Sequence, residues 1–501
     1  MSITLSEKEK RWMEGVIKEE QITRYLENGR DFIDDEEIWE KLRKNQNPDK
    51  QRIREIIQKS LEIETLEPDE TAALLNVKDP ELWQEIFDAA AKIKKKVYDS
   101  RIVTFAPLYC SNLCVNNCVY CGFRRENTVI KRRRLTLEEV RREAEVLAGE
   151  IGHKRLIAVY GEHPTTDAKY IADTIRTIYE VKVKTKNGYG QIRRVNVNAA
   201  PMSIEELEML RDVGIGTYQV FQETYHHETY KKLHPEGTIK SHYQWRLYCH
   251  HRALEAGVDD VALGVLFGLY DWRFEVMGLL YHARNLEKFF GIGPHTISFP
   301  RLEPAANTPF AQESKYKVSD EDFKKLIAVI RLSVPYTGMI LTAREPAHLR
   351  DEILSMGIVT QTDASTKIGI GAYSDRYTEQ EAERQQFLLG DTRSLDELIR
   401  ELAKMGYITS FCTAGYRCGR TGKHIMTLLK TGREAVFCKL NAVLTFREWL
   451  DDFASEETKI AGEQVIQKEI EEIKERVPAE VFSKLMEYYR RIQNGERDLY
   501  F

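Results

Sequence analysis

Three cysteines in one short segment are the residues of this 501-residue chain with the most distinctive chemistry. Cys114, Cys118 and Cys121 follow the spacing CxxxCxxC. Cysteine thiolates ligate iron-sulfur clusters, and three of them at this spacing can reach three irons of one 4Fe-4S cube. The fourth iron then has no protein ligand. The motif therefore predicts a 4Fe-4S cluster with one open coordination position.

The open iron suggests which small molecule the cluster would bind. It can chelate the amino and carboxylate groups of S-adenosyl-L-methionine, and a reduced cluster can pass one electron into the sulfonium and release a 5'-deoxyadenosyl radical. The sequence thus predicts an enzyme of radical chemistry with adenosylmethionine as its second cofactor.

Two other uses of these cysteines fit less well. A structural zinc site needs a second close ligand pair, but Cys249 is isolated and the remaining three cysteines lie far downstream. A thioredoxin-type pair at Cys118 and Cys121 would leave Cys114 without a role.

Composition indicates an ordinary globular protein. The net charge of −5 gives no electrostatic argument for nucleic acid or for an anionic membrane as partner. The first residues lack an apolar signal segment, and no run of about 18 apolar residues occurs. Eight clustered cysteines fit iron ligation in a reducing compartment better than a disulfide framework. We therefore expect a cytoplasmic protein.

The elements that would position the cysteines form three regions. Residues 1–95 are charged and helical in period, with helix starts at Pro68 and Pro80, and predict a helical N-terminal extension. In residues 96–368, β-branched runs alternate with amphipathic helices, which predicts an α/β fold, a (βα)8 TIM barrel. Residues 369–501 are expected to form a mainly helical C-terminal domain. The expected strands are 102–108, 155–160, 195–198, 217–222, 261–267, 296–299, 339–342 and 359–362.

Several polar residues follow the expected strands, at the barrel end where chemistry gathers. Tyr120 either packs beside the adenine of the nucleotide or simply packs near the cluster. Glu162 follows a glycine and can accept from the ammonium group of adenosylmethionine. Glu223 can bridge two ribose hydroxyls, and Arg246 can pair with the methionine carboxylate. Each of these charges has a surface ion pair as its alternative.

Further candidates lie on the same rim. Arg301 and Arg344 are cations at strand ends, where the carboxylate of a substrate amino acid can dock. His226, His227 and His234 are either proton donors or iron ligands, with a plain surface position as the alternative, above all for His227.

Dense motifs along nearly the whole chain resemble the tyrosine lyases of the radical SAM superfamily, and among them the maturases of FeFe-hydrogenase assembly. The 2-iminoacetate synthases of thiamine biosynthesis are shorter relatives. The segments that carry the resemblance are Cys114-Val-Asn-Asn-Cys118-Val-Tyr-Cys121-Gly, Gly161-Glu-His-Pro164, Val195-Asn-Val-Asn, Gly216-Thr-Tyr-Gln-Val-Phe-Gln-Glu-Thr-Tyr-His226, Gly264-Val-Leu-Phe-Gly-Leu-Tyr-Asp271, Gly293-Pro-His-Thr-Ile-Ser298 and Tyr336-Thr-Gly-Met-Ile.

The resemblance implies a two-part reaction. The adenosyl radical removes hydrogen from the amino group of L-tyrosine, the Cα–Cβ bond breaks, and p-cresol and dehydroglycine form. In the maturases, dehydroglycine becomes carbon monoxide and cyanide at an auxiliary iron-sulfur cluster in the C-terminal domain. Arg344 matches the expected anchor for the tyrosine carboxylate. Hydrogenase maturation proteins, and a reductant such as ferredoxin or flavodoxin, are the implied partners.

The chain departs from this pattern in two places. The maturases carry a C-terminal CxxC and, after 22 intervening residues, a third cysteine, and the corresponding positions here are Cys412, Gly415 and Cys438. Cys418 either replaces the missing ligand or is an ordinary thiol. Asp363 stands where a smaller, uncharged stretch is expected near the substrate carboxylate, which questions tyrosine as the substrate.

Three functions remain open. The first is a lyase that completes both half-reactions, and the second is a lyase that stops at dehydroglycine or cleaves another aromatic amino acid. The third is a non-catalytic carrier of an iron-sulfur cluster. A carrier needs no nucleotide and substrate contacts, so the charged residues at the barrel mouth argue against it.

Overall fold

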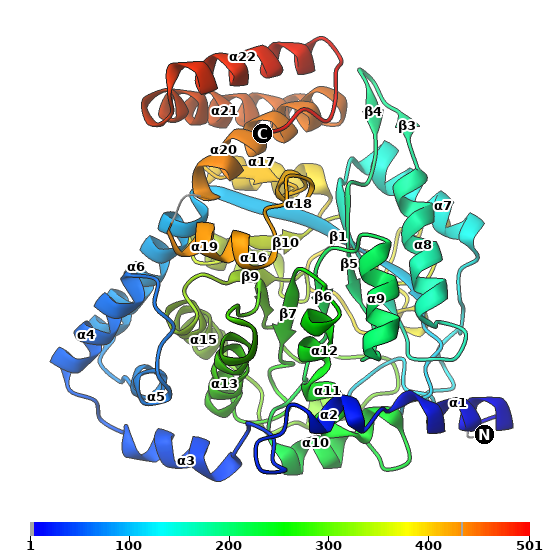
Figure 1. The fold of residues 1–501 in the computed structure, drawn as a ribbon. Helices are drawn as coiled ribbons and strands as arrows, with labels where there is room; N and C mark the ends of the chain where they lie inside the picture. Colours follow the sequence, from blue (N-terminus) through cyan, green and yellow to red (C-terminus); the bar gives the residue numbers. More distant parts are fainter. Residues whose placement is uncertain (1–4, 432–433) are drawn as a thin grey trace.

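The computed structural model describes residues 5–431 and 434–501. Eight parallel strands in these residues close into a barrel, because the last of them pairs with the first through Thr104 and Thr362. The expected (βα)8 barrel is confirmed. In spatial order its strands are β1 (Arg101–Ser111), β2 (Arg155–Tyr160), β5 (Arg194–Asn198), β6 (Tyr218–Gln219), β7 (Val261–Gly264), β8 (Thr296–Ser298), β9 (Gly338–Leu341) and β10 (Gln361–Asp363) (Figure 1).

Three short strands lie outside this barrel. β3 (Val183–Lys184) and β4 (Tyr189–Gly190) form a small antiparallel pair. β11 (Ile408–Ser410) runs parallel to the first residues of β1. The strand β1 is therefore longer than the other barrel strands and pairs at its start with a segment from the C-terminal region.

Helices cover the outside of the barrel, and their starts follow the sequence signals. Thr136 with Glu139 and Ser203 with Glu206 follow the S/T-x-x-E pattern, and both pairs form capping boxes. The helices of this part are α7 (Leu137–Glu145) with a π-helical turn (Val146–Ile151), α8 (Ala168–Glu180), α9 (Ile204–Asp212), α10 (His227–Leu233), a 3-10 turn (Ile239–Ser241), α11 (Tyr243–Leu247), α12 (Cys249–Glu255), α13 (Trp272–Phe290), α14 (Phe310–Glu313), α15 (Asp320–Ser333), α16 (Ala347–Ser355) and a 3-10 turn (Ala382–Arg384).

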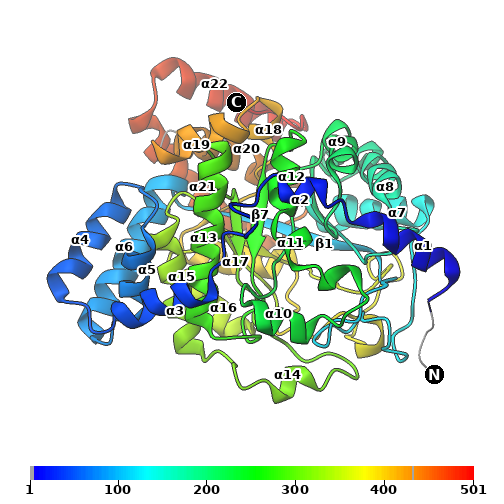
Figure 2. The same ribbon diagram turned by 60° about the horizontal axis from the view of Figure 1, so that its bottom comes forward.

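The N-terminal residues are helical, as expected, with Pro68 and Pro80 in the first turns of two helices. Figure 2 shows the first part of this segment running along the outside of the barrel near α10 and α11, and its last helices grouped beside α15. The helices are α1 (Glu7–Val16), α2 (Glu20–Thr23), α3 (Asp35–Lys44), α4 (Lys50–Leu61), α5 (Pro68–Leu75) and α6 (Pro80–Tyr98).

The C-terminal region packs where β1 begins, and Figure 1 shows its helices together at that end of the barrel. The helix α20 contacts β11, α21 and α22. The division at residues 95/96 and 368/369 stays a prediction. The helices are α17 (Leu395–Lys404), α18 (Ala414–Arg417), α19 (Gly422–Lys430), α20 (Glu434–Asp452), α21 (Glu456–Arg476) and α22 (Ala479–Gln493).

A buried carboxylate ties α20 to the barrel. Glu448 Oε2 lies 3.2 Å from Lys154 Nζ and 2.8 Å from Arg193 Nη2, and the Asp498 N–H donates to Glu448 Oε1 at 2.7 Å. Burial alone would raise the pKa of Glu448, but Arg193 and Lys154 lower it to about 2. Because the folded pKa is depressed, this contribution to stability is complete above the ordinary carboxyl pKa and is lost as pH falls toward 2.

Replacing Glu448 with glutamine is expected to destabilise the protein by about 3 kcal/mol, because two buried cations lose their counter-charge. The measurement is the midpoint temperature of unfolding, with hydrogen exchange in α20 as a local readout. The matched control is Glu457→Gln, whose carboxylate is 80% exposed in its pair with Arg400; a change of at most about 0.5 kcal/mol is expected there. Equal midpoints for the two variants would contradict the anchoring role of Glu448.

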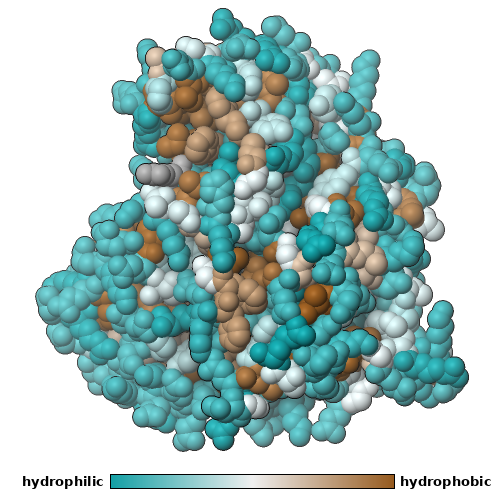
Figure 3. Space-filling view, viewed as in Figure 1, coloured by the Kyte–Doolittle hydropathy of each residue, from teal (hydrophilic) through white to brown (hydrophobic). Residues whose placement is uncertain are grey.

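The face in Figure 3 consists mainly of hydrophilic side chains, and apolar ones form small separate patches. The large apolar side chains that are exposed lie far apart in sequence and include Met209, Phe289 and Ile460. Among the described residues, no helix has both the length and the apolar character needed to cross a bilayer.

Candidate active site at the carboxyl end of the barrel

The cysteine loop leaves β1 at the carboxyl end of the barrel. The Val115 N–H donates to the Glu162 carbonyl at 2.8 Å and holds the loop against the end of β2. A glycine is required there, since a Cβ at Gly161 would lie 2.2 Å from the Leu113 carbonyl oxygen. The structure brings three predicted thiols and five other predicted residues into the wall of one cavity of about 240 Å3. They are Cys114, Cys118, Cys121, Tyr120, Glu162, Glu223, Arg246 and Arg344.

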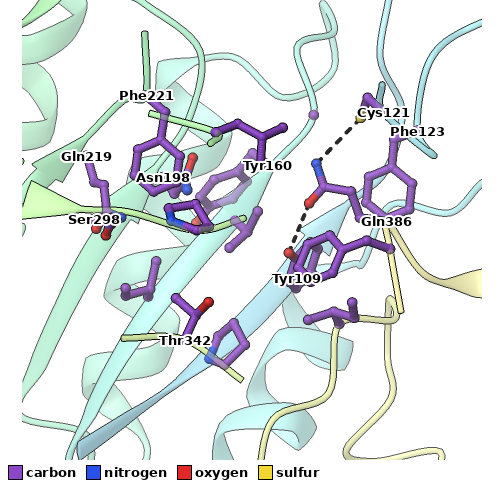
Figure 4. Close-up of a pocket in the computed structure, with 18 of the residues that line it drawn as sticks. Tyr109, Cys121, Phe123, Tyr160, Asn198, Gln219, Phe221, Ser298, Thr342 and Gln386 are labelled. Atoms are coloured by element: carbon purple, nitrogen blue, oxygen red, sulfur yellow. Dashed lines mark hydrogen bonds between the residues drawn. The ribbon is translucent and has the colours of Figure 1, made fainter. Parts of the chain in front are cut away.

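Amide groups that the sequence did not single out face two of the sulfur atoms. Asn116 Nδ2 lies 3.8 Å from Cys114 Sγ, and Gln386 Nε2 lies 3.5 Å from Cys121 Sγ. Figure 4 shows Gln386 reaching toward Cys121 on one side while it accepts from the Tyr109 hydroxyl, at 3.0 Å, on the other. Burial raises the pKa of Cys118 to about 12, so ligation of iron has to supply the energy that stabilises the thiolate.

Glu162 presents an unsatisfied carboxylate oxygen to this cavity. Its Oε2 accepts from Asn116 Nδ2, and its Oε1 is buried without a hydrogen-bond partner in the described part of the chain. Burial raises the pKa of this carboxyl group. A cationic ligand at Oε1 would satisfy the oxygen and favour the ionised form.

Glu223 lies between two cations. Lys240 Nζ is 2.8 Å from Glu223 Oε1 and Arg246 Nη2 is 3.4 Å from it. Burial alone would raise the pKa of Glu223, but these cations lower it. Lys240 was not predicted as a site residue from the sequence, although it lies between the predicted residues Glu223 and Arg246 in the chain and could have been identified from that position.

Tyr120 is fixed by His234. His234 Nδ1 donates to the Tyr230 carbonyl at 2.8 Å, so Nε2 is left to accept from the Tyr120 hydroxyl at 2.7 Å. Burial lowers the pKa of His234 well below its usual value. His234 therefore positions an aromatic ring of the cavity wall, and its expected roles as proton donor or iron ligand stay predictions.

These side chains fit a 4Fe-4S cluster and adenosylmethionine. Three thiols would hold three irons, the free oxygen of Glu162 suits an ammonium group, and the carboxylate of Glu223 beside Lys240 and Arg246 suits hydroxyl and carboxylate groups. The buried oxygen of Glu162 is the observation that most directly calls for a ligand.

Arg344 is a cation in the wall of the same cavity. Its guanidinium lies 3.4 Å from the centre of the Phe387 ring, and its side chain makes no ion pair or hydrogen bond with any described residue. Burial, together with the nearby Glu345, raises the pKa of Glu303 to about 7, although Arg344 and Arg301 oppose the shift. An arginine without a partner in a cavity wall is suited to a bidentate carboxylate.

Aromatic side chains make up much of the remaining wall, and Figure 4 shows their rings around a common space. Of the rings labelled there, two come from β1 and β2, one from the cysteine loop and one from the segment after β6, with small polar groups beside them. The labelled aromatic residues are Tyr109, Phe123, Tyr160 and Phe221, and the polar ones include Asn198, Gln219, Ser298 and Thr342.

Two predicted catalytic residues lie outside this wall. Arg301 Nε donates to Glu345 at 3.0 Å and its Nη1 donates to Asp320 at 2.8 Å. The guanidinium group is therefore already hydrogen-bonded to two carboxylates of the protein. The His226 ring stacks on Tyr270 with centroids 3.9 Å apart and caps α10. Their catalytic roles stay predictions that this geometry does not support.

His227 also lies outside the cavity. Its Nδ1 is 2.9 Å from Asp35 Oδ1, and it contacts Asp31 as well. Burial lowers its pKa, but the two carboxylates outweigh this effect and raise it to about 9. The surface alternative therefore describes His227 best, as an ion pair that fastens the N-terminal segment.

Asp363 lines the cavity, but its carboxylate is occupied by the protein. Oδ1 accepts from the Ala343 N–H at 2.7 Å and Oδ2 accepts from the Thr366 hydroxyl at 2.6 Å. The Arg350 guanidinium, whose Nη2 lies 3.8 Å from Oδ1, partly offsets the negative charge that a substrate carboxylate would meet. The presence of Asp363 is thus compatible with an amino-acid substrate.

A second cavity, of about 40 Å3, lies at the opposite end of the barrel, and Cys412, Gly415 and Cys438 line it. Cys418 does not line it. Its thiol is exposed and lies 3.4 Å from the Phe501 carbonyl oxygen. Spacing alone allowed Cys418 as a substitute ligand, but α18 directs position 415, not position 418, to the cavity.

The geometry agrees with comparisons to known proteins. The Radical SAM superfamily matches residues 108–277, and the Biotin and Thiamin Synthesis associated domain matches residues 298–408. The first match spans the cysteine loop and its surroundings. The barrel with its three-thiol loop is a radical SAM enzyme.

Solved structures and a curated relative narrow this class. A crystal structure of HydG, a maturase of the FeFe-hydrogenase, is 48% identical with a TM-score of 0.88, over 94% of this chain and all of that one. The chain belongs to the HydG family of radical SAM enzymes. HydG from Carboxydothermus hydrogenoformans is 39% identical with a TM-score of 0.75, over 95% of this chain and 99% of that one. The 2-iminoacetate synthase of Salmonella typhimurium is 29% identical over 70% of this chain and 88% of its own length.

Proposed function

We propose that the protein cleaves the Cα–Cβ bond of L-tyrosine to p-cresol and dehydroglycine, and that dehydroglycine is then converted to carbon monoxide and cyanide for FeFe-hydrogenase assembly. One observation carries the first part: three thiols and the free guanidinium of Arg344 share one cavity with aromatic walls. Membership of the HydG family supports the second part. Hydrogenase maturation proteins, and a reductant such as ferredoxin or flavodoxin, are the proposed partners.

The roles of the residues follow from their chemistry. When bound, the cluster and adenosylmethionine together supply a carbon radical that abstracts hydrogen. Cys114, Cys118 and Cys121 would hold the cluster, and Glu162 would accept from the ammonium group of adenosylmethionine. Arg344 would bind the tyrosine carboxylate. Aromatic rings of the wall would enclose the substrate side chain and exclude water.

The test is product analysis with anaerobically reconstituted protein, adenosylmethionine, dithionite and L-tyrosine. We expect p-cresol, carbon monoxide and cyanide. Absence of p-cresol would overturn the lyase assignment, and p-cresol without the diatomic products would limit the reaction to its first half.

That shorter reaction is the second candidate. It is favoured by Gly415, which provides no donor in the C-terminal cavity, and by the exposed position of Cys418. A protein that stops at dehydroglycine would accumulate its hydrolysis product, glyoxylate, in step with p-cresol.

Replacing Glu162 with glutamine is expected to weaken adenosylmethionine binding by about 10-fold to 100-fold, because a hydrogen bond between charged groups is worth about 1.5 to 3 kcal/mol. Equilibrium binding to the reconstituted protein measures this. The control is Glu228→Gln, whose side chain is 71% exposed on α10. Equal affinities of the two variants would remove Glu162 from the nucleotide site.

A further inference from the structure

The cavity at the start of β1 is built in part from two segments of the C-terminal region. Cys412 follows β11, and Cys438 lies on α20. Arg101 of β1 is in the same wall, and its Nε is buried without a hydrogen-bond partner among the described residues. Two thiols beside an unpartnered cation suit an anionic group, such as an iron-sulfur cluster carrying thiolates.

Position 415 does not supply a third donor, but a carboxylate nearby can. Glu434 is 3% exposed and lies four residues before Cys438, so both side chains occupy one face of α20. Glu434 Oε1 is 3.2 Å from Cys438 Sγ and 3.3 Å from Arg420 Nε. Glu434 Oε2 is buried and has no hydrogen-bond partner in the described part of the chain.

We propose that the carboxylate of Glu434 replaces the missing third thiolate, so that Cys412, Cys438 and Glu434 together bind the second iron-sulfur group of this protein. Carboxylates ligate iron in non-haem sites, and histidines replace two cysteines in Rieske clusters, so an iron-sulfur cluster accepts ligands other than thiolates. The proposal deepens the proposed function and rests on it, since it names the ligands of the site where dehydroglycine would be converted.

His295 lines the same wall. Its Nε2 is 3.4 Å from the Tyr416 hydroxyl, and its Nδ1, 3.6 Å from Asp260, is buried without a hydrogen-bond partner among the described residues. Of these two side chains, Glu434 is the one that contacts Cys438. Position 415 itself has space for a side chain, because a Cβ there would lie at least 3.7 Å from its nearest neighbour. A cysteine introduced at 415 can therefore serve as a rescue ligand.

The experiment counts iron at this site alone. In the full-length chain with Cys114, Cys118 and Cys121 all replaced by serine, we expect anaerobic reconstitution to leave bound iron and sulfide. Adding Glu434→Gln is expected to lower that iron at least fivefold, and adding Gly415→Cys to this variant is expected to restore it. The matched control, Cys418→Ser, is expected to leave the iron unchanged.

Retention of iron in the Glu434→Gln variant would overturn the proposal, as would loss of iron in Cys418→Ser. If circular dichroism shows that the triple serine variant does not fold, the iron content of Glu434→Gln in the otherwise unaltered chain is the deciding measurement. In that variant we expect one of two iron populations to be lost and the other to remain. Formation of p-cresol by the unaltered chain reports on the lyase function separately, so failure of one proposal is distinguishable from failure of the other.

Discussion

A chain with alanine in place of Cys118 is expected to form no detectable 5'-deoxyadenosine from adenosylmethionine. Cys118 is buried in the cavity wall, and the loop offers no nearby thiol to replace it beyond Cys114 and Cys121, which are already needed as ligands. Two thiolates hold a 4Fe-4S cube poorly, and without the cluster no electron reaches the sulfonium. Iron content and 5'-deoxyadenosine, measured together after reconstitution, give the result.

Cys110 provides the control for this experiment. It is also a buried thiol near the loop, but it lies on β1 outside the cavity wall. Cys110→Ala is expected to keep its iron and its adenosylmethionine cleavage. Continued cleavage by Cys118→Ala would refute the assignment of the cysteine motif.

Removing the Arg344 guanidinium is the second large effect that we expect. Arg344→Ala should lower kcat/KM for L-tyrosine about 100-fold, since a buried charged contact to a carboxylate is worth about 3 kcal/mol. Arg344→Lys should recover part of this loss, because it keeps the charge but not the two-pronged geometry. The rate of p-cresol formation at varied tyrosine concentration measures both variants.

A substrate without the carboxylate makes this test specific. Tyrosinol should be a poor substrate of the unaltered protein, and Arg344→Ala should reduce its reaction little further, because the contact is already absent. Additive losses from the two changes would show that Arg344 acts elsewhere than on the carboxylate. Unchanged kcat/KM for tyrosine in Arg344→Ala would also exclude the anchor.

The barrel was predictable because its signals are local. Each of the eight expected runs overlaps a barrel strand, and the caps at Thr136 and Ser203 are formed by residues three apart. The strand β11 was missed, since three residues carry little periodicity and its partner β1 lies about 300 residues earlier in the chain.

The site was predictable only in part, because only some of its residues carry a local signal in the sequence. Cysteine spacing and the residues that follow strands pointed to Cys114, Glu162 and Arg344. Contacts made over long sequence separations, such as Gln386 with Cys121, leave no local pattern. Likewise, whether Gly415 or Cys418 faces the C-terminal cavity depends on the turn of α18, which spacing does not specify.

The strand β1 lines cavities at both ends of the barrel. Every second residue of β1 lines a cavity: Arg101 and Val103 belong to the C-terminal one, and Phe105, Pro107 and Tyr109 belong to the other. Because neighbouring residues of a strand point to opposite faces, inserting or deleting one residue at its start would turn side chains away from their cavity. The two cavities therefore depend on the same pairing register of β1, and a register error in this strand would disturb the walls of both.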